Sequence, residues 1–489
     1  MFQKFCCISI FLLSVTALIH ETESSTEQVC QRTQVLVLGA GIAGIAAAKA
    51  LSENGVEDFI IVEYNEEIGG RCHHTSFGED RNGDPYTVEL GANWIQGTVT
   101  KNGPENPIWT LAREHNLRTH PSNGSSLLTY DPTGQVNYVD KLTEFDTYYS
   151  RVENDNRRSF TTGESQQLLN LKGFEDVDLR SALSEAGYSP KNDPQAHTAE
   201  WYKMDYEYAQ PPELSSRART LASYNSTFRH FSPTSHFSLD PRGFNTIIHG
   251  LASTYLTPSD PRLHLSTIVR NITYTPSNVT IHNTDGSCTM ASHAITTFSL
   301  GVLKSPFVTF TPPLPTWKTS SIAKMSMGTY TKIFMQFPRD RIFWNTFTEF
   351  FLYASSHMRG YYPLFQSLSH VDFLPGSAIL IATVTSPFSS IIESQPLETT
   401  KSQVLDVLRE MFGVENVPEP TAFMLPKWGE LEWAKGSFSN WPPGFTGWGR
   451  MWWAGEHTSR EWYGYLHGAF DEGSSVGVRV AKLMYNGQC

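Results

Sequence analysis

The chain has 489 residues, of which 39% are hydrophobic and 18% are charged. This composition is typical of a folded protein and excludes disorder as its main state. There are 37 Lys and Arg residues against 49 Asp and Glu residues, so the formal net charge is −12 at pH 7. Because that charge repels phosphate backbones and anionic membrane surfaces, nucleic acid is not expected as a partner. The length allows about three domains, or two that interrupt each other in sequence.

Residues 1–24 have the features of an export signal. One cation, Lys4, precedes an apolar run from Phe5 to Leu18. The run is shorter than the roughly 20 apolar residues that a spanning helix needs, and no later segment is apolar enough to span. We therefore expect a secreted protein with no membrane span after signal removal. Surface glycosylation is expected at four Asn-x-Ser/Thr sequons: Asn123, Asn225, Asn271 and Asn278.

Cysteines are few. Removal of the signal leaves Cys30, Cys72, Cys288 and Cys489, which do not make a disulfide scaffold. One or two disulfides can form in an oxidising compartment, and Cys30 and Cys489 are candidates only because both lie near chain ends. No Cys/His cluster has zinc spacing, so no metal site is expected.

The segment 35–63 predicts a complete βαβ unit. The apolar runs Val35–Leu38 and Phe59–Val62 are each typical of a strand buried on both faces of a parallel sheet. Between them, an Ala-rich stretch over 45–51 favours a helix that stops at Asn54-Gly55.

Three glycines after the first strand indicate dinucleotide binding. Gly39 allows a tight turn, Gly41 lets the backbone approach a pyrophosphate, and Gly44 lets the helix pack on the strand. The helix N-terminus then offers free N–H groups to phosphates. Glu63 ends the second strand, where a carboxylate can bind ribose hydroxyls. A glycine-rich turn without a ligand is the alternative, but the context favours a dinucleotide site.

The rest of the chain is less regular at first. Residues 140–235 have weak periodicity and are assigned to a substrate domain. Short β-rich runs between Leu263 and Ile295, split by Asp285-Gly286, predict a hairpin meander. The pattern also predicts three later elements: a helix over 403–412 that stops at Gly413, a strand over 451–453, and a closing helix marked by Val476, Val480 and Leu483.

A strand over 329–337 would place a cation in an apolar setting. In such a strand Tyr330, Lys332 and Phe334 share one face. A buried cation is costly unless it is paired or used. A lysine that snorkels from a sheet edge to water is the simpler interpretation of composition alone.

Further glycine-rich stretches favour FAD over NAD. Glu67–Arg71 and Glu89–Trp94 provide more points of close backbone approach than NAD needs. Near the C-terminal end, Ala454–Thr458 and Tyr463–Ala469 form a strand, a turn and a helix start, where a flat ring system could be capped.

With these motifs the chain resembles the flavin-dependent amine oxidases, and within them the secreted polyamine oxidases of plants and fungi. The resemblance spans nearly the whole mature chain. The motifs that carry it are Val35–Gly44, Gly69-Gly70-Arg71, Leu90–Trp94, Leu300–Leu303, Tyr330–Phe334, Gly436–Pro442 and Gly455–Thr458.

The resemblance implies an α/β fold in which an FAD-binding Rossmann-like domain is interleaved with an α+β substrate-binding domain. Residues 33–94, 236–305 and 436–489 would form the first domain, and residues 95–235 and 306–435 the second. The implied reaction is oxidation of an amine C–N bond. The amine would lose hydride to flavin N5, the imine would hydrolyse to an aldehyde, and O2 would reoxidise the flavin to give H2O2.

Cofactor contacts follow from the same resemblance. Glu63 and Arg71 would contact the adenosine and phosphate part of FAD, and Val269 would meet the adenine through its backbone. Glu456 would lie by the ribityl and pyrophosphate. The glycine-rich stretches add Gly91, Ala92, Gly464 and Tyr465 to the expected cofactor contacts. FAD is expected to be non-covalent, because Ser437 stands about where related monoamine oxidases carry a cysteine that bonds to the flavin.

Catalytic and substrate residues are implied as well. Lys332 resembles the lysine that holds a water near flavin N5 and assists reoxidation. Trp94, Phe438 and Tyr465 would line the substrate side, where aromatic rings can orient an amine. His457 and His467 suggest acid/base or metal roles, but their neighbours fit flavin-loop geometry better, so both are expected to be structural.

Two departures bear on the substrate. Plant polyamine oxidases place two glutamates in the substrate tunnel, and we align these with Gln96 and Gln210. The loss of two anionic groups puts a polyamine substrate in doubt, unless acids elsewhere, such as Glu207, reach the tunnel. Three alternatives stay open: a tailoring oxidase of a secondary-metabolite amine, an L-amino-acid oxidase, which would need an arginine for the carboxylate, and a secreted flavin-binding protein without turnover.

Overall fold

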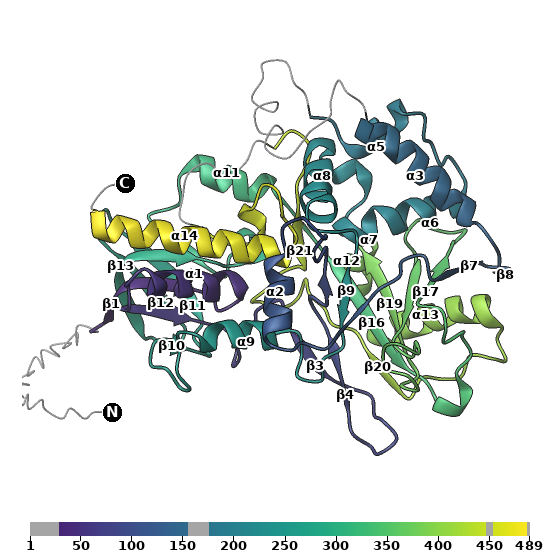
Figure 1. Ribbon diagram of the computed structural model, residues 1–489, viewed down its shortest axis with the longest axis horizontal. Coiled ribbons are helices and arrows are strands. Elements are labelled where there is room, and N and C mark those ends of the chain that lie inside the picture. Colours follow the sequence, from purple (N-terminus) through teal and green to yellow (C-terminus); the bar gives the residue numbers. More distant parts are fainter. Residues whose placement is uncertain (1–28, 155–175, 446–452, 487–489) are drawn as a thin grey trace, which may run out of the picture.

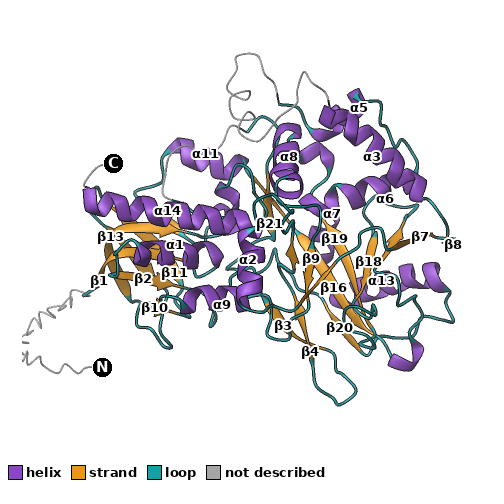
Figure 2. Ribbon diagram, in the orientation of Figure 1, coloured by secondary structure: helices purple, strands orange, loops and turns teal. Residues whose placement is uncertain are grey.

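The computed structural model describes residues 29–154, 176–445 and 453–486, and the predicted signal lies outside these ranges. The described chain is built around two seven-stranded sheets with helices packed against them. Figure 1 shows one sheet in each of two lobes, and Figure 2 shows how the helices cover them. The expected α/β fold class is thus confirmed.

The first sheet contains the predicted βαβ unit. In spatial order its strands are β10 (Leu263–His264), β2 (Phe59–Val62), β1 (Gln31–Leu38), β13 (Cys288–Thr296), β12 (Val279–Asn283), β11 (Val269–Tyr274) and β14 (Thr309–Thr311). β1 pairs in parallel with β2 on one side and β13 on the other. Its alternate residues enter two apolar clusters, Val35 and Val37 in one, Leu36 and Leu38 in the other. This explains why β1 reads as a continuous apolar run.

Three helices pack on this sheet: α1 (Ile42–Glu53), α9 (Thr246–Ser253) and α14 (Leu466–Asn486). α1 and α14 lie side by side (Figure 1), and both contribute to the cluster that contains Val35 and Val37. Their contact depends on Gly473, where an added Cβ would lie 2.1 Å from the Ala43 carbonyl oxygen. The predicted closing helix is therefore present, and it covers the cofactor-binding unit.

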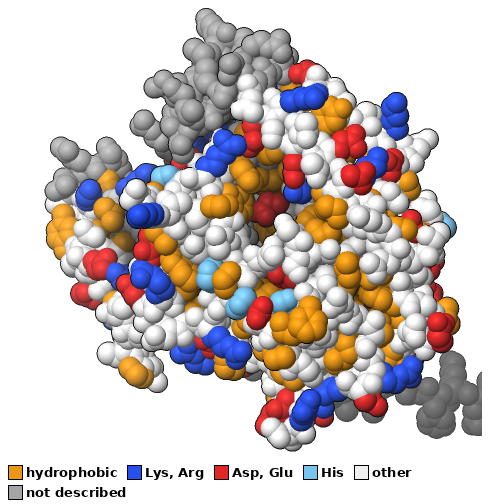
Figure 3. Space-filling view, turned by 45° about the vertical axis from the view of Figure 1, so that its right-hand side comes forward, with side chains coloured by type: hydrophobic (Ala, Val, Ile, Leu, Met, Phe, Trp, Pro, Cys, Tyr) orange, Lys and Arg blue, Asp and Glu red, His pale blue; other side chains and the backbone are white. Residues whose placement is uncertain are grey.

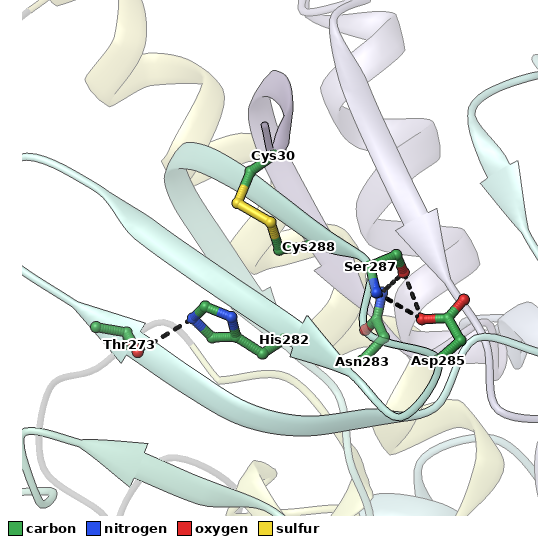
Figure 4. Close-up of a disulfide and its surroundings, with 7 residues drawn as sticks. All are labelled: Cys30, Thr273, His282, Asn283, Asp285, Ser287 and Cys288. Carbon is green, nitrogen blue, oxygen red and sulfur yellow. Dashed lines mark hydrogen bonds between the residues drawn. A yellow bond between two sulfur atoms is a disulfide. The ribbon is translucent and has the colours of Figure 1, made fainter. Parts of the chain in front are cut away.

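A disulfide joins Cys30 to Cys288, with the two Cα atoms 4.7 Å apart (Figure 4). The parallel register pairs Gln31 with Thr289, so the residue before each lies at the same point of the ladder. Cys30, a candidate from its place near a chain end, is therefore confirmed as a disulfide cysteine with Cys288 as its partner, and Cys489 lies outside the described residues. Figure 4 also shows the predicted turn, in which the Ser287 amide donates to Asp285.

The second sheet lies in the other lobe. Its strands, in spatial order, are β20 (Ala422–Met424), β16 (Tyr330–Gln336), β19 (Ile379–Thr385), β18 (Leu364–Ser367), β17 (Phe350–Tyr353), β7 (Leu127–Asp131) and β8 (Gly134–Gln135). Ile333 and Met335 of β16 pack with helix α13 (Leu397–Phe412). The residues that alternate with these two along β16, Lys332 among them, lie on the opposite face, as the strand periodicity predicts. Gly413 caps α13 with a φ of +92°.

The remaining elements connect and cover the sheets. Shorter strands form two pairs and a three-stranded sheet: β3 (His74–Phe77) with β4 (Tyr86–Glu89), β15 (Ser326–Gly328) with β21 (Phe438–Asn440), and β5 (Trp94–Ile95) with β9 (His236–Ser238) and β6 (Thr119–Pro121). The other helices are α2 (Pro107–Glu114), α3 (Val139–Asn154), α5 (Leu179–Glu185), α6 (Pro194–Lys203), α7 (Asp205–Tyr208), α8 (Arg217–Tyr224), α10 (Leu300–Lys304), α11 (Thr316–Lys324) and α12 (Phe388–Ser394).

One predicted strand lies at the edge of the described ranges. Of the expected strand over 451–453, only Trp453 is described, and it forms a single parallel bridge with Thr296.

Among the helices of the described ranges, none combines the length and apolar character needed to cross a bilayer.

Candidate active site

One elongated cavity of about 480 Å³ runs between the two lobes. It is bordered by residues of the glycine-rich turn at one end and by a group of aromatic side chains at the other. Figure 3 shows a hollow in the surface of the molecule, with hydrophobic side chains at its rim and an acidic side chain at its floor. The cavity brings together segments that are far apart in sequence, as a site between two domains requires.

The glycine turn forms one end of the cavity. Gly39 has a φ of +116°, which favours glycine, and an added Cβ at Gly44 would lie 1.9 Å from the Gly39 carbonyl oxygen. Gly41 borders the cavity, and an added Cβ there would meet no atom closer than 3.9 Å. The first turn of α1 also borders the cavity, so its free N–H groups are available to phosphates.

Glu63 lies at the end of β2, beside the turn. It is 6% exposed, and its carboxylate accepts hydrogen bonds from the Ala40 amide at 2.7 Å and the Asn65 amide at 3.0 Å. Burial raises the pKa of Glu63, and these hydrogen bonds oppose that rise. Val269, at the start of β11, borders the same end of the cavity. This end therefore offers a carboxylate and backbone groups to a polar ligand.

An ion pair between Arg71 and Glu456 ties the two distant glycine-rich segments together. The Arg71 guanidinium donates to Glu456 Oε1 at 2.8 Å and to the Ser437 carbonyl at 2.9 Å. The Gly464 amide donates to the other Glu456 oxygen at 2.8 Å. Burial acts to raise the pKa of Glu456, but the charge of Arg71 and the hydrogen bonds from Ser439 and Arg71 hold the pKa below its ordinary value. Glu456 is thus a buried anion that fixes the C-terminal loops.

Lys332 of β16 is one of the residues that border the cavity. It is 4% exposed, and its Nζ donates to the carbonyl oxygens of Gly91 at 2.6 Å and Glu89 at 3.2 Å. Burial lowers the pKa of Lys332 to about 7, while the charge of Glu89 acts to raise it. The snorkelling interpretation is therefore wrong, because the ammonium group is held inside the protein. Ala92, next to Gly91, also borders the cavity.

Aromatic side chains form the far end of the cavity. The rings of Tyr330 and Phe438 lie 5.8 Å apart, and Trp94 and Tyr465 border the same space. Gly464 has a φ of +80°, and an added Cβ would lie 3.3 Å from the Phe438 ring, so the loop can pass closely beside it. This aromatic chamber is suited to an organic cation or a flat ring.

The two glutamines differ in position. Gln96 borders the cavity, but Gln210 is not among its described lining residues. Gln210 is 5% exposed, donates to Ser326 Oγ at 2.6 Å and accepts from Asn440 at 3.2 Å. The role of Gln210 as a substrate residue therefore stays a prediction. Ala209, which lies between Glu207 and Gln210 at the end of α7, has a φ of +57°, and the chain turns there.

Glu207 borders the aromatic chamber and accepts a hydrogen bond from Tyr465 Oη at 2.6 Å. From the sequence, Glu207 is expected only as an alternative acid that could reach the tunnel. Burial raises the pKa of Glu207, and the Tyr465 hydrogen bond opposes the rise. The signal that could have found it is its place in a short helix just before the Pro-Pro pair, three residues before Gln210. The chamber therefore has an acid after all.

The two candidate histidines are buried and do not face the aromatic chamber. Burial lowers the pKa of His457 to about 4 and that of His467 to about 3, so both are neutral at pH 7. His467 lies between Asn106 and Thr227, at 3.5 and 3.3 Å. In the described ranges no group of three or more His, Cys, Asp or Glu residues is arranged to hold a metal ion.

The four predicted glycosylation positions differ in exposure. Asn123 is exposed, whereas Asn225, Asn271 and Asn278 are partly buried. Asn225 begins a short π-helix after α8. Asn123 stands between Ser122 and Gly124, both of which border the cavity.

These features fit FAD better than a smaller ligand. The cavity is lined by the glycine turn and Glu63, by the Arg71–Glu456 pair, by Lys332 and by the aromatic chamber. A dinucleotide needs the glycine cradle and helix N-terminus at one end, and a flat ring needs an apolar slot at the other.

The chain is similar to known proteins over most of its length. Residues 42–481 match the family described as flavin containing amine oxidoreductase. The chain is 36% identical over 479 residues to polyamine oxidase 1 of Zea mays, covering 93% of this chain and 90% of the relative. It is 34% identical over 504 residues to polyamine oxidase 6 of Oryza sativa subsp. japonica, covering 98% and 96%.

Solved structures show a similar fold. A putrescine oxidase variant superposes with a TM-score of 0.71 over 93% of this chain and 100% of that chain, at 16% identity. At this identity the likeness concerns the fold alone.

Proposed function

Because the chain belongs to the family of flavin containing amine oxidoreductases, we propose that it oxidises an amine C–N bond with non-covalently bound FAD and O2. The observation that carries this proposal is one cavity that is lined by a dinucleotide cradle, by Lys332 and by an aromatic chamber with one acid. FAD and an amine can therefore meet beside a buried lysine.

Each part of the cavity has a role in the proposed reaction. The glycine turn, Glu63 and the Arg71–Glu456 pair would hold the cofactor, which when bound supplies a two-electron acceptor. Phe438 and Tyr465 would orient the amine, and Lys332 would hold a proton or a water near the reacting atoms. The substrate would lose a hydride from the carbon next to nitrogen and a proton from the nitrogen, and so become an imine. Water would hydrolyse the imine to an aldehyde and an amine, and O2 would take up two electrons and two protons to become H2O2.

The acid Glu207 indicates which amines would fit. A carboxylate that is buried beside Tyr465 is stabilised when a cation comes close, because its negative charge is poorly solvated. Gln96, which borders the same cavity, offers hydrogen bonds but no charge. We therefore propose amines that place one ammonium group near Glu207, with fewer charges than spermine.

An amino acid is a less suitable substrate. It would need an arginine for its carboxylate, and the arginines among the described lining residues are Arg71 and Arg270. Arg71 is paired with Glu456 at 2.8 Å and Arg270 with Glu432 at 3.3 Å, both beside the predicted cofactor end. This favours an amine oxidase over an L-amino-acid oxidase.

Secretion is part of the proposal. It is supported by the signal-like residues 1–24, by the sequon at the exposed Asn123, and by the Cys30–Cys288 disulfide, which is typical of an oxidising compartment. An N-terminal sequence and intact mass of the protein from culture medium would test it.

The activity is tested by peroxide release from an amine panel. The panel contains monoamines, diamines, acetylated polyamines, spermidine, spermine and amino acids, each assayed with the purified yellow protein. We expect H2O2 with amines of low charge, and little with amino acids. A protein that holds FAD but releases peroxide with none of them would be a flavin-binding protein without turnover.

Denaturation is expected to release the flavin. Ser437 borders the cavity where a thiol would be needed for a thioether, and its hydroxyl is already engaged with the backbone of Tyr330, at 2.8 and 3.1 Å. After acid precipitation, the supernatant should contain FAD in a molar amount close to that of the protein. Flavin that stays with the pellet would contradict non-covalent binding.

Replacing Gln96 with glutamate is expected to lower KM for spermine more than for a monoamine. Two opposite charges about 4 Å apart attract by on the order of 4 kcal/mol at an effective dielectric constant near 20, before desolvation. Even a fraction of that would change KM about tenfold. Gln96→Met, of similar length and without charge, is the control. If the unaltered enzyme already prefers spermine at low KM, the inference from Gln96 is wrong.

A further inference from the structure

Glu89 is a buried acid beside Lys332 that the proposed reaction does not use. It ends β4, is 7% exposed, and its backbone carbonyl accepts a hydrogen bond from Lys332 Nζ. Within the described part of the chain, its carboxylate has no lysine, arginine or histidine at ion-pair distance. A buried acid in that state needs a compensating charge or solvent.

The side chain of Glu89 is held at one oxygen and open at the other. Oε1 accepts the Phe244 amide at 2.6 Å, whereas Oε2 has no hydrogen-bond partner among the described residues. Glu89 borders a separate void of about 10 Å³ together with Asn93, Ser238 and Asp240. Ser238 Oγ is also buried without a partner there. The void is about the size of one water, which these two oxygens could hold.

Of the groups around Glu89, Lys332 is the cation whose charge acts on the Glu89 carboxylate. Asp240 borders the same void, but it is bound by Arg242 at 2.8 Å. Cys72 is buried, and burial raises the pKa of its thiol so far that it is neutral. His74 is the cross-strand partner of Glu89 on β3. Glu393 lies on the other face of β16, where it accepts from Thr331 at 2.6 Å.

We propose that Glu89 is the positioning residue for Lys332: its carbonyl fixes the ammonium group, and its carboxylate charge keeps the proton on it. The proposal rests on the proposed function only in giving Lys332 a task. The electrostatics point the same way, since burial lowers the pKa of Lys332 to about 7 while Glu89 acts to raise it. Burial likewise raises the pKa of Glu89 to about 7, and Lys332 opposes that rise. Loss of the Glu89 charge would therefore let Lys332 lose its proton at lower pH.

The test measures the titration of Lys332 directly. The purified holoprotein is labelled with trace acetic anhydride across pH 5.5 to 10, and the Lys332 peptide is quantified by mass spectrometry against the exposed Lys101. In Glu89→Gln, the midpoint of the Lys332 reactivity curve should fall by about one pH unit, as expected on loss of a nearby opposite charge. Glu89→Asp, which keeps a charge but withdraws it by one methylene, should lower the midpoint by less. Glu393→Gln, a buried charge removed on the other face of β16, is the matched control and should leave it in place.

An unmoved midpoint in Glu89→Gln would overturn the proposal, and so would an equal fall in Glu393→Gln. If Glu89→Gln does not fold, Glu89→Asp decides, because an unchanged midpoint there overturns the proposal as well. The labelling needs no turnover, so the two proposals fail separately. A shifted midpoint in a protein that oxidises no amine would support the role of Glu89 and contradict the proposed function.

Discussion

Lys332→Met is expected to leave the protein folded and yellow but to slow turnover about 100-fold or more. Methionine keeps the apolar volume of the side chain and removes the only group that Lys332 offers to the reacting atoms. A positioned proton donor or charge is worth about 10²-fold or more in rate. Two carbonyl oxygens, of Glu89 and Gly91, would lose their donor, so a modest fall in Tm is expected too. Stopped-flow absorbance of flavin reduction and reoxidation would show which half-reaction slows.

Lys304→Met is the matched control for Lys332→Met. Lys304 Nζ also donates to backbone carbonyls, of Ile322, Ala323 and Met325, at 2.7 to 3.2 Å. It does not belong to the described lining of the cavity. Its replacement should lower Tm by a similar amount and leave both half-reactions unchanged. If Lys332→Met kept wild-type rates in both half-reactions, Lys332 would be a structural residue.

Gly41→Ala is expected to abolish most FAD binding without unfolding the protein. A methyl group at Gly41 meets no protein atom closer than 3.9 Å, so the fold can accept it, but it borders the cavity where phosphates would approach the backbone. We expect FAD affinity to fall at least about tenfold, or 1.4 kcal/mol. The ratio of flavin to protein absorbance and a titration of FAD into the apoprotein would measure it.

Gly44→Ala separates the two effects of glycine in this turn. A Cβ there would lie 1.9 Å from the Gly39 carbonyl oxygen, so the turn or helix α1 must shift, and both Tm and FAD content should fall. Gly41→Ala should keep its far-ultraviolet circular dichroism and most of its Tm. Full FAD occupancy in Gly41→Ala would contradict the placement of the phosphates at this turn.

Local patterns predicted the parts of the molecule whose structure is set by local physics. A continuous apolar strand followed by three spaced glycines predicts a strand, a turn and a helix, and the structure has β1, the Gly39 turn and α1 in that order. The alternation along β16 predicts that Lys332 and Tyr330 face the same side, and both border the cavity. In each case the period of the side chains decides the outcome.

The sequence left open what contacts between distant segments decide. Cys30 pairs with Cys288 because β1 and β13 lie in register, and no feature near Cys30 indicates which strand will be its neighbour. Glu207 and Gln210 are three residues apart, and of the two only Glu207 is among the described lining residues of the cavity. Ala209 between them adopts a left-handed backbone conformation. That conformation is uncommon for alanine, so the motif alone does not predict it.

The most direct test of amine oxidation is the absorbance of the bound flavin under anaerobic conditions. An amine that releases peroxide in air is mixed with the yellow protein without oxygen, and oxygen is then admitted. We expect the visible flavin band to bleach on mixing and to return with oxygen, with one H2O2 formed per flavin. A band that no amine of the panel bleaches, in protein that carries FAD and is reduced by dithionite, would contradict it.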